Sequence, residues 1–200
     1  SIATMIRANI SWGDNEYQLI FKKLITWLNE KQSSNTGLWG DNKVQGIAGQ
    51  VNGTYHLTRG TFFASNFKIL NARPLLDSLI DFLKTDTNFS NNRGEGCYDL
   101  DSTFLLYKLS KELPNHRKSE VRNFAINRLF SLLKRRNSDG LYGYFIEYSQ
   151  DYHNYHFVGN KTKNVSDIQG VVFYLTTIFY LAKIVDNNIK IPWRPSLTHG

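Results

Sequence analysis

The stretch FKKLITWLNEKQSSNTGLWG, at residues 21–40, decides the fold of this 200-residue chain. Its apolar residues at positions 21, 24, 25 and 28 follow the i, i+3, i+4, i+7 spacing of a buried helical stripe, and polar residues occupy the opposite side. After Gln32 and a polar stretch comes Gly37, which can adopt a positive φ angle at little cost. The stretch therefore predicts an amphipathic helix that ends in a glycine turn.

Degenerate copies of this unit recur at residues 79–98 and 129–143, where an apolar helical stripe again precedes a glycine and an aromatic residue. Such self-similarity is typical of helical repeat proteins. The periodicity predicts roughly six helices in three pairs, each with an amphipathic first member and a more buried second member. We expect the first members at 15–31, 72–85 and 118–136, and the second members at 55–70, 100–113 and 167–186.

Amphipathic outer helices that alternate with buried inner helices are the pattern of an α/α toroid or solenoid. No region has the period of a β-strand, and the last expected helix is apolar on nearly every side. We therefore expect an all-α fold, an α/α toroid or partial toroid of about three helical hairpins. It should form a single domain over residues 1–200.

The connections expected at 32–54 and 137–166 are much longer than the few residues typical of helical hairpins. Long loops often carry functional residues. Hairpin geometry places all three outer-to-inner connections at the same end of the bundle. We therefore expect the functional site at a mouth formed by the starts of the inner helices.

Composition limits the class of protein and its location. Hydrophobic residues make up 41% of the chain and aromatic residues 14%, which is enough for a sizeable core. A single cysteine excludes an internal disulfide and favours a reducing cytoplasm. The first residues lack the basic head and apolar run of a signal peptide, and the start looks cut from a longer protein. The apolar run at 171–182 is about half the length needed to cross a bilayer, so we expect a buried helix there.

The net charge of +7 favours anionic partners, and a peripheral contact with a membrane surface stays open. The densest basic cluster, Lys134-Arg135-Arg136, falls at the predicted end of a helix, where cations offset the helix dipole. No base-stacking aromatic residues are interleaved with this cluster. We therefore expect no nucleic-acid partner.

The residues Trp27-Leu28, Gln32 and Gly37-Leu38-Trp39 resemble the QW motif of the terpenoid cyclase and protein prenyltransferase superfamily. That motif reads aromatic, aliphatic, three residues, Gln, a short spacer and Gly-x-Trp. The third unit has Asn137 in place of Gln and Tyr142 in place of Trp. The resemblance implies an α/α toroid of which this chain supplies roughly half the helices. The chain is then a fragment of a larger protein, an open partial toroid, or a half that forms a homodimer.

A second resemblance lies at residues 99–103, where Asp-Leu-Asp-Ser-Thr is similar to the Asp-x-Asp-Asp-Thr segment of proton-initiated terpenoid cyclases. In those enzymes the middle aspartate protonates an alkene or epoxide, a role that the resemblance gives to Asp101. Such a donor must be buried so that it stays protonated, and Asp99 and Ser102 are placed to orient it. The alternative is that Asp99 or Asp101 only caps the start of its helix.

Other residues are expected at the same mouth. In the toroid, Tyr55, His56 and Arg59 open the first inner helix and face the two aspartates. His56 suits a catalytic base, and Arg59 suits an anion-binding residue or the partner of an aspartate. The other residues expected to bind substrate are Trp39, Tyr98, Tyr142, Asp167 and Gln169. Aromatic side chains of this kind line a cavity for a hydrocarbon or stack on sugar rings.

A zinc site is a weaker hypothesis. Cys97, Asp99 and the histidines at 56, 153 and 156 have the right ligand chemistry, and prenyltransferases of the superfamily use Asp, Cys and His ligands. No local pair such as Cys-x2-Cys supports it, and a lone cysteine is commonly a small buried residue. We therefore expect no metal and no cofactor.

Three functions follow from these observations. The first is a terpenoid-cyclase-like or prenyl-binding domain with an isoprenoid ligand, with Asp101 as the acid and Asp99 and His56 beside it. The second is a carbohydrate-processing enzyme, a glycoside hydrolase or polysaccharide lyase, with its site at the same mouth. The third is a non-catalytic helical-repeat module that binds a partner.

Overall fold

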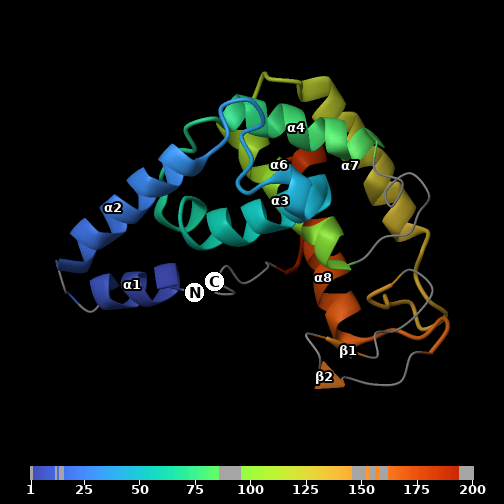
Figure 1. Cartoon of the computed structure of the whole chain (residues 1–200). Coiled ribbons are helices and arrows are strands. Elements are labelled where there is room, and N and C mark those ends of the chain that lie inside the picture. Colours follow the sequence, from blue (N-terminus) through green and yellow to red (C-terminus); the bar gives the residue numbers. More distant parts are fainter. Residues whose placement is uncertain are drawn as a thin grey trace. The chain divides into compact units, whose positions relative to one another are not determined.

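The computed structural model describes residues 2–11, 13, 16–85, 96–145, 152–153, 156–157 and 162–193. Almost all of its regular secondary structure is helical, as expected for an all-α fold (Figure 1). The helices are α1 (Ile2–Ser11), α2 (Glu16–Lys31), α3 (Asn42–Gly60), the short 3-10 helix η1 (Phe63–Ser65), α4 (Ala72–Thr85), α6 (Gly96–Glu112), α7 (Lys118–Leu133) and α8 (Ile168–Val185). The two-residue strands β1 (Tyr152–His153) and β2 (His156–Phe157) pair antiparallel.

The amphipathic first members of the expected pairs correspond to α2, α4 and α7. The bounds of α4 coincide with the expected 72–85, and α7 begins at the expected Lys118 but ends at Leu133, before the basic cluster. The buried last helix is also present as α8. Asp167 caps its start and Asp186 its end, which explains its bounds. The all-α class is thus confirmed, and the toroid arrangement stays a prediction.

Two inner helices begin earlier than the sequence predicts. α3 starts at Asn42 rather than at residue 55, because the Asp41 side chain accepts a hydrogen bond from the Lys43 backbone N–H (2.9 Å) and caps the helix. Gly46 then interrupts the helical geometry with φ 65°, so the segment lacks a continuous periodicity that the sequence could reveal. The expected long connection at 32–54 is therefore wrong, and the true connection runs only from 32 to 41. α6 likewise starts at Gly96, and α1 was not expected at all.

The chain divides into two compact units, with the boundary inside α4, after Ser78. The first unit contains α1, α2, α3, η1 and the first part of α4, and the second contains the rest of α4 with α6, α7, α8 and the β-hairpin. The expectation of a single domain over residues 1–200 stays a prediction.

The expected stripe of α2 forms part of the core of the first unit. Phe21, Ile25 and Leu28 are each no more than 5% exposed, and the Phe21 ring packs against Phe67 with centroids 5.9 Å apart. α1 packs against α2 (Figure 1). Trp27, the aromatic residue that opens the QW-like motif, is by contrast 53% exposed. The apolar stripe therefore predicted the buried face correctly, and the motif's first aromatic lies outside it.

The buried side chain of Gln32 joins three segments of the first unit. Its amide nitrogen donates a hydrogen bond to the Gly37 carbonyl (2.8 Å), and its amide oxygen accepts one from the Asn71 backbone N–H (2.9 Å), directly before α4. The Trp39 indole N–H donates to the Leu28 carbonyl in the last turns of α2 (2.7 Å). Gln32 and Trp39 thus fix the end of α2 against the glycine turn and the next outer helix.

The second unit repeats the backbone pattern of this turn. In each unit a backbone N–H beyond the end of the outer helix donates to the leucine carbonyl of a Gly-Leu-aromatic-Gly sequence, and the N–H of the first glycine donates back to the carbonyl of the same residue. The bonds are Ser33 to Leu38 (3.0 Å) and Gly37 to Ser33 (2.8 Å) in the first unit, and Asn137 to Leu141 and Gly140 to Asn137 (both 2.9 Å) in the second. This equivalence aligns Asn137 with Ser33 and corrects its sequence-based alignment with Gln32.

In the second unit α8 packs against both α6 and α7 (Figure 1). Its core includes Leu105 and Leu109 of α6, Ala125 and Leu132 of α7, and Leu181 of α8, all at most 1% exposed. α8 also has the length and hydropathy to cross a bilayer, and 39% of it is buried inside the structure. A core helix satisfies the same criteria, and its contacts with two neighbours fit that role.

The glycine turn gives the first prediction. A Cβ added at Gly37 would lie 2.3 Å from the Leu75 backbone nitrogen, at a φ of +68° that disfavours any side chain. Gly37→Ala should therefore lower the free energy of unfolding by about 3 kcal/mol. The control is Gly53→Ala, where the added Cβ meets nothing within 4 Å inside α3. It should raise stability by roughly 0.5–1 kcal/mol. Urea denaturation checks both, and equal effects of the two substitutions would contradict the turn geometry.

Candidate functional site

The predicted site residues of the first unit lie near the end of α3, not at its start. The Arg59 guanidinium donates a hydrogen bond to the Tyr55 hydroxyl (2.9 Å) and lies 5.0 Å from the centroid of the Tyr55 ring. The His56 ring packs edge-on against the same tyrosine, with centroids 5.0 Å apart. The structure therefore brings Tyr55, His56 and Arg59 together. Because α3 begins at Asn42, they do not open the inner helix as the sequence suggested.

Trp39 belongs to the core of the first unit. Its side chain is 6% exposed, and its indole N–H donates a hydrogen bond to the Leu28 carbonyl of α2. The centroid of its ring lies 5.7 Å from that of the Phe62 ring. Its backbone N–H donates to the Thr54 hydroxyl of α3 (3.4 Å). These contacts fit a structural residue better than a substrate-binding one.

Asp99 lies in the first turn of α6 and forms a buried ion pair with Arg128 of α7. Arg128 donates from Nε to one carboxylate oxygen (2.8 Å) and from Nη2 to the other (2.6 Å), and the two side chains are 0% and 4% exposed. Asp99 thus binds a neighbouring helix rather than capping its own. The sequence analysis missed Arg128, although it lies on the buried stripe of α7 with Val121, Ala125 and Leu132.

Arg128 of the ion pair and the nearby Tyr174 both have raised pKa values. Burial disfavours the charged form of Arg128, but the adjacent Asp99 carboxylate outweighs it and raises the pKa of the guanidinium. Burial, and then the negative charge of Asp99, raise the pKa of Tyr174 well above its usual value. The Tyr174 ring in turn packs against Tyr142, with centroids 5.3 Å apart. This cluster therefore has a stable pattern of charge at neutral pH.

Asp167 holds the start of α8 in place. One carboxylate oxygen accepts a hydrogen bond from the Gly170 backbone N–H (2.7 Å), and the other accepts from the Tyr144 backbone N–H (2.7 Å). An added Cβ at Gly170 would lie 2.2 Å from the Gly143 carbonyl carbon, so helix and loop are in direct backbone contact. Both oxygens of Asp167 are thus engaged in the fold.

The loop at Tyr144 connects the starts of α6 and α8. The Gly96 backbone N–H donates to the Tyr144 carbonyl (3.0 Å), and the Tyr144 hydroxyl lies 2.9 Å from the Cys97 sulfur. The starts of these two inner helices therefore lie at the same end of the second unit, as hairpin geometry predicts. The long connection expected between α7 and α8 is also present.

The remaining predicted residues lie at or near this end. Asp101 is 2% exposed within α6, and Tyr98 is half-buried in the first turn of the same helix. Within the described residues, the Tyr142 hydroxyl and the Gln169 side-chain oxygen are buried without a hydrogen-bond partner. Two groups of predicted residues thus exist, one in each unit. The shared mouth that would join them stays a prediction.

The ligands considered for zinc are only partly described. Cys97 and Asp99 lie in the first turn of α6, and His153 and His156 are register partners in the β-hairpin, where their side chains lie outside the described residues. Among the residues that the structure describes, no three His, Cys, Asp or Glu side chains gather as a metal site.

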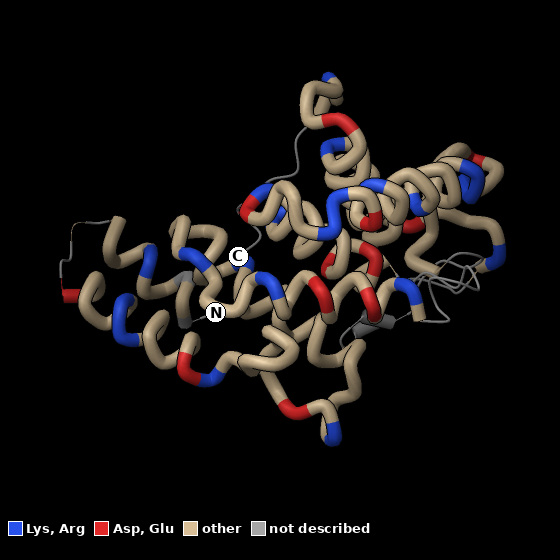
Figure 2. Tube along the Cα trace, turned by 90° about the horizontal axis from the view of Figure 1, so that it is seen from above, with Lys and Arg blue, Asp and Glu red and all other residues tan. Residues whose placement is uncertain are grey.

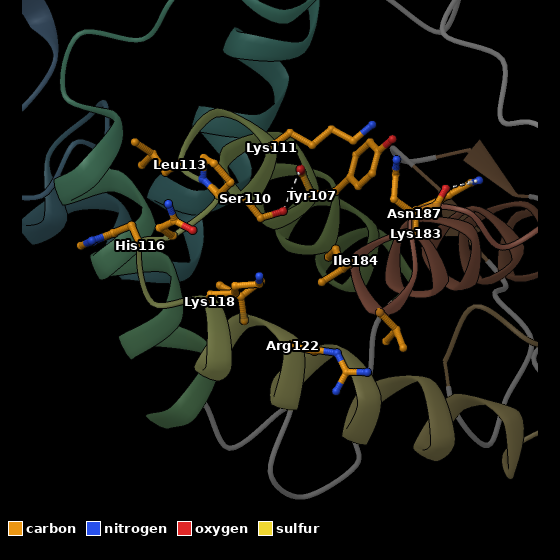
Figure 3. A pocket seen from close by; sticks show the side chains of 14 residues that line it. Tyr107, Ser110, Lys111, Leu113, His116, Lys118, Arg122, Lys183, Ile184 and Asn187 are labelled. Atoms are coloured by element: carbon orange, nitrogen blue, oxygen red, sulfur yellow. Dashed lines mark hydrogen bonds between the residues drawn. The ribbon is translucent and has the colours of Figure 1, made fainter.

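A pocket of about 410 Å³ lies at the opposite end of the second unit (Figure 3). The ends of α6 and α8, the turn at 113–116 and the first turns of α7 form its walls. Its lining contains no aspartate or glutamate and includes the basic residues Lys111, His116, Lys118, Arg122 and Lys183. Elsewhere basic and acidic residues are mixed along the helices (Figure 2). Sequence analysis missed this pocket, because each basic residue is separately plausible at a solvated helix end.

Comparisons with family models, curated proteins and solved structures found no match to this chain.

The Asp99–Arg128 pair gives the second prediction. Arg128→Met alone leaves a buried carboxylate without its cation, and should lower the free energy of unfolding by about 3–5 kcal/mol. The double variant Asp99→Leu/Arg128→Met replaces both charges with apolar groups, and should recover most of that loss. Thermal and urea unfolding measure both variants. A double variant as unstable as the single one would show that the pair has a role beyond mutual neutralisation.

His56 gives the third prediction. Partial burial, and then the nearby positive charge of Arg59, lower the pKa of His56 below its usual value of 6.5. As the pH falls below 6.5, the unfolded chain therefore binds more protons than the folded chain, and the free energy of unfolding decreases. The contribution of His56 is fully present at higher pH. The slope between about pH 7.5 and 5.5 should be smaller in His56→Gln. Urea unfolding at several pH values measures it, and an unchanged slope would contradict the assignment.

Proposed function

We propose that this chain is an α-helical repeat domain that binds a ligand and carries out no reaction at the starts of α6 and α8. The observation that carries the proposal is the bidentate pair of Asp99 with Arg128. The cyclase hypothesis needs Asp99 to orient the acid Asp101, and a glycosidase needs carboxyl groups that can reach the substrate. Both oxygens of Asp99 instead accept hydrogen bonds from the buried guanidinium, so this carboxylate is engaged in the fold.

The other carboxylate at this end supports the same conclusion. Asp167 accepts one backbone hydrogen bond at each oxygen, both at 2.7 Å, so it is committed to the start of α8. A glycosidase needs two carboxyl groups, one as acid and one as base or nucleophile, roughly 5–10 Å apart. With Asp99 and Asp167 both engaged, carbohydrate processing is less well supported than binding.

A terpenoid-cyclase-like function is the second candidate, because Asp101 is buried, as a proton donor of that kind must be. Membership of the terpenoid cyclase and prenyltransferase superfamily is likewise a proposal. The bonds of Gln32 and Trp39 support it, since they join the end of an outer helix to its turn and to the next outer helix. This support concerns the scaffold and not the chemistry.

The fourth prediction separates the two candidates. The protein is incubated with a polyisoprenoid alkene, its epoxide, a prenyl diphosphate and oligosaccharides, and products are sought by mass spectrometry. We expect no product from any of them. Formation of a product that Asp101→Asn abolishes would overturn the proposal. The matched control is Asp139→Asn, because Asp139 is an exposed turn residue. A product that persists in Asp101→Asn but is lost in His56→Gln would place chemistry in the first unit instead.

A further inference from the structure

We propose that the pocket at the ends of α6 and α8 binds a phosphorylated small molecule with an apolar group, and that Lys118 and Arg122 hold its phosphate. This inference names the ligand class of the binding domain proposed above and rests on that function. The pocket lies at the opposite end of the second unit from Asp99 and Asp101, so it is a separate site. Figure 3 shows its walls, with α7 carrying Lys118 and Arg122 on one side of the cavity.

The charge of the pocket is not balanced by its own lining. Within the described residues, neither Lys118 nor Arg122 has a hydrogen-bond or ion-pair partner, and no lining residue is acidic. Glu120, the acidic residue between them in sequence, accepts hydrogen bonds from Arg117 and Lys84. The Arg117 bond, and then that of Lys84, lower the pKa of Glu120 to about 2. Its charge is thus committed to other cations.

Two of the remaining cations already have structural roles. The Lys183 ammonium donates to the backbone carbonyls of Asn187 (3.0 Å) and Ile189 (2.8 Å), beyond the end of α8. The Lys111 ammonium lies 4.5 Å from the centroid of the Tyr107 ring. These contacts leave Lys118 and Arg122 as the cations best placed to bind an anion.

The position of the two residues on α7 favours a single anionic group. They are four residues apart, so they lie on the same face of the helix, one turn from each other. Arg117, the residue directly before α7, has φ 49° and makes no side-chain capping hydrogen bond to the helix. The N–H groups of the first turn therefore add positive potential beside Lys118. A lysine, an arginine and a helix start together suit the doubly charged phosphate better than a carboxylate.

The pocket is also too large and too apolar for phosphate alone. Its volume of about 410 Å³ lies within the range typical of small-molecule sites. Six lining residues are apolar or aromatic and come from three helices and the turn between α6 and α7: Tyr107, Leu113, Pro114, Val121, Ile184 and Val185. An organic group on the phosphate would cover these side chains, which would add affinity by the burial of apolar surface.

The fifth prediction concerns ligand binding to the full chain, measured by calorimetry. The probes are naphthyl phosphate, inorganic phosphate and naphthol. Naphthyl phosphate should bind saturably, and more tightly than either inorganic phosphate or naphthol, because only it uses both the cations and the apolar wall. The double variant Lys118→Gln/Arg122→Gln should weaken binding by about tenfold or more. Rising salt should weaken it as well.

The matched control is Lys134→Gln/Arg136→Gln, which removes the same charge from exposed positions just beyond the end of α7. It should change the affinity by less than about twofold. Equal weakening in both double variants would overturn the site, as would the absence of saturable binding by naphthyl phosphate. Binding only to vesicles that contain an anionic phospholipid would overturn the small-molecule ligand in favour of a lipid headgroup. Product formation is measured separately, so failure of this site and failure of the non-catalytic function remain distinguishable.

Discussion

The hydrogen-bonded Gly-Leu-aromatic-Gly turn is the constraint on which the arrangement of the helices depends. In both units it follows the end of an outer helix and is closed by a similar pair of backbone hydrogen bonds. In the first unit Gly37 must be glycine, because its φ is +68° and the backbone at Leu75 leaves no space for a Cβ. In the second unit the aromatic residue of the turn, Tyr142, packs against Tyr174 of α8. In the first unit α3 begins two residues after the turn, and in the second the Asp167 backbone N–H before α8 donates to the Tyr142 carbonyl of the turn (3.2 Å), so each turn contacts or directly precedes the start of an inner helix.

The sequence predicted the outer helices well because their burial is one-sided. A stripe such as that of α2 leaves a period that survives in the sequence whatever it packs against. The start of α3 could not be predicted in this way, since Gly46 takes a φ of 65° and the segment has no continuous apolar stripe. The start of α3 is marked by the hydrogen bond with which the Asp41 side chain caps the helix. In the sequence alone, this aspartate looks like the many aspartates found in loops.

The candidate sites were harder to predict because they depend on contacts between helices. Nothing in the segment 99–103 shows that Asp99 pairs with Arg128 of α7. An arginine is expected at the surface, and Arg128 is recognised as buried only because it falls on the apolar stripe of α7. The basic pocket was even harder to predict from the sequence. It combines the ends of two helices with the start of a third, and each of its cations alone has an ordinary explanation at a helix end. Only the packing of α6, α7 and α8 brings them together.

Charges are arranged in opposite ways at the two ends of the second unit, and the proposed phosphate site depends on this difference. At the start of α6 the carboxylate of Asp99 and the guanidinium of Arg128 neutralise each other in the interior. Leaving one of these buried charges unpaired would cost about 3–5 kcal/mol. At the start of α7, Lys118 and Arg122 are four residues apart with like charge, an arrangement that destabilises a helix by about 0.2–0.5 kcal/mol. A bound anion would offset that repulsion and would stabilise the folded chain by an amount that grows with the logarithm of its concentration. The surplus of positive charge is therefore more easily explained by a ligand than by the fold.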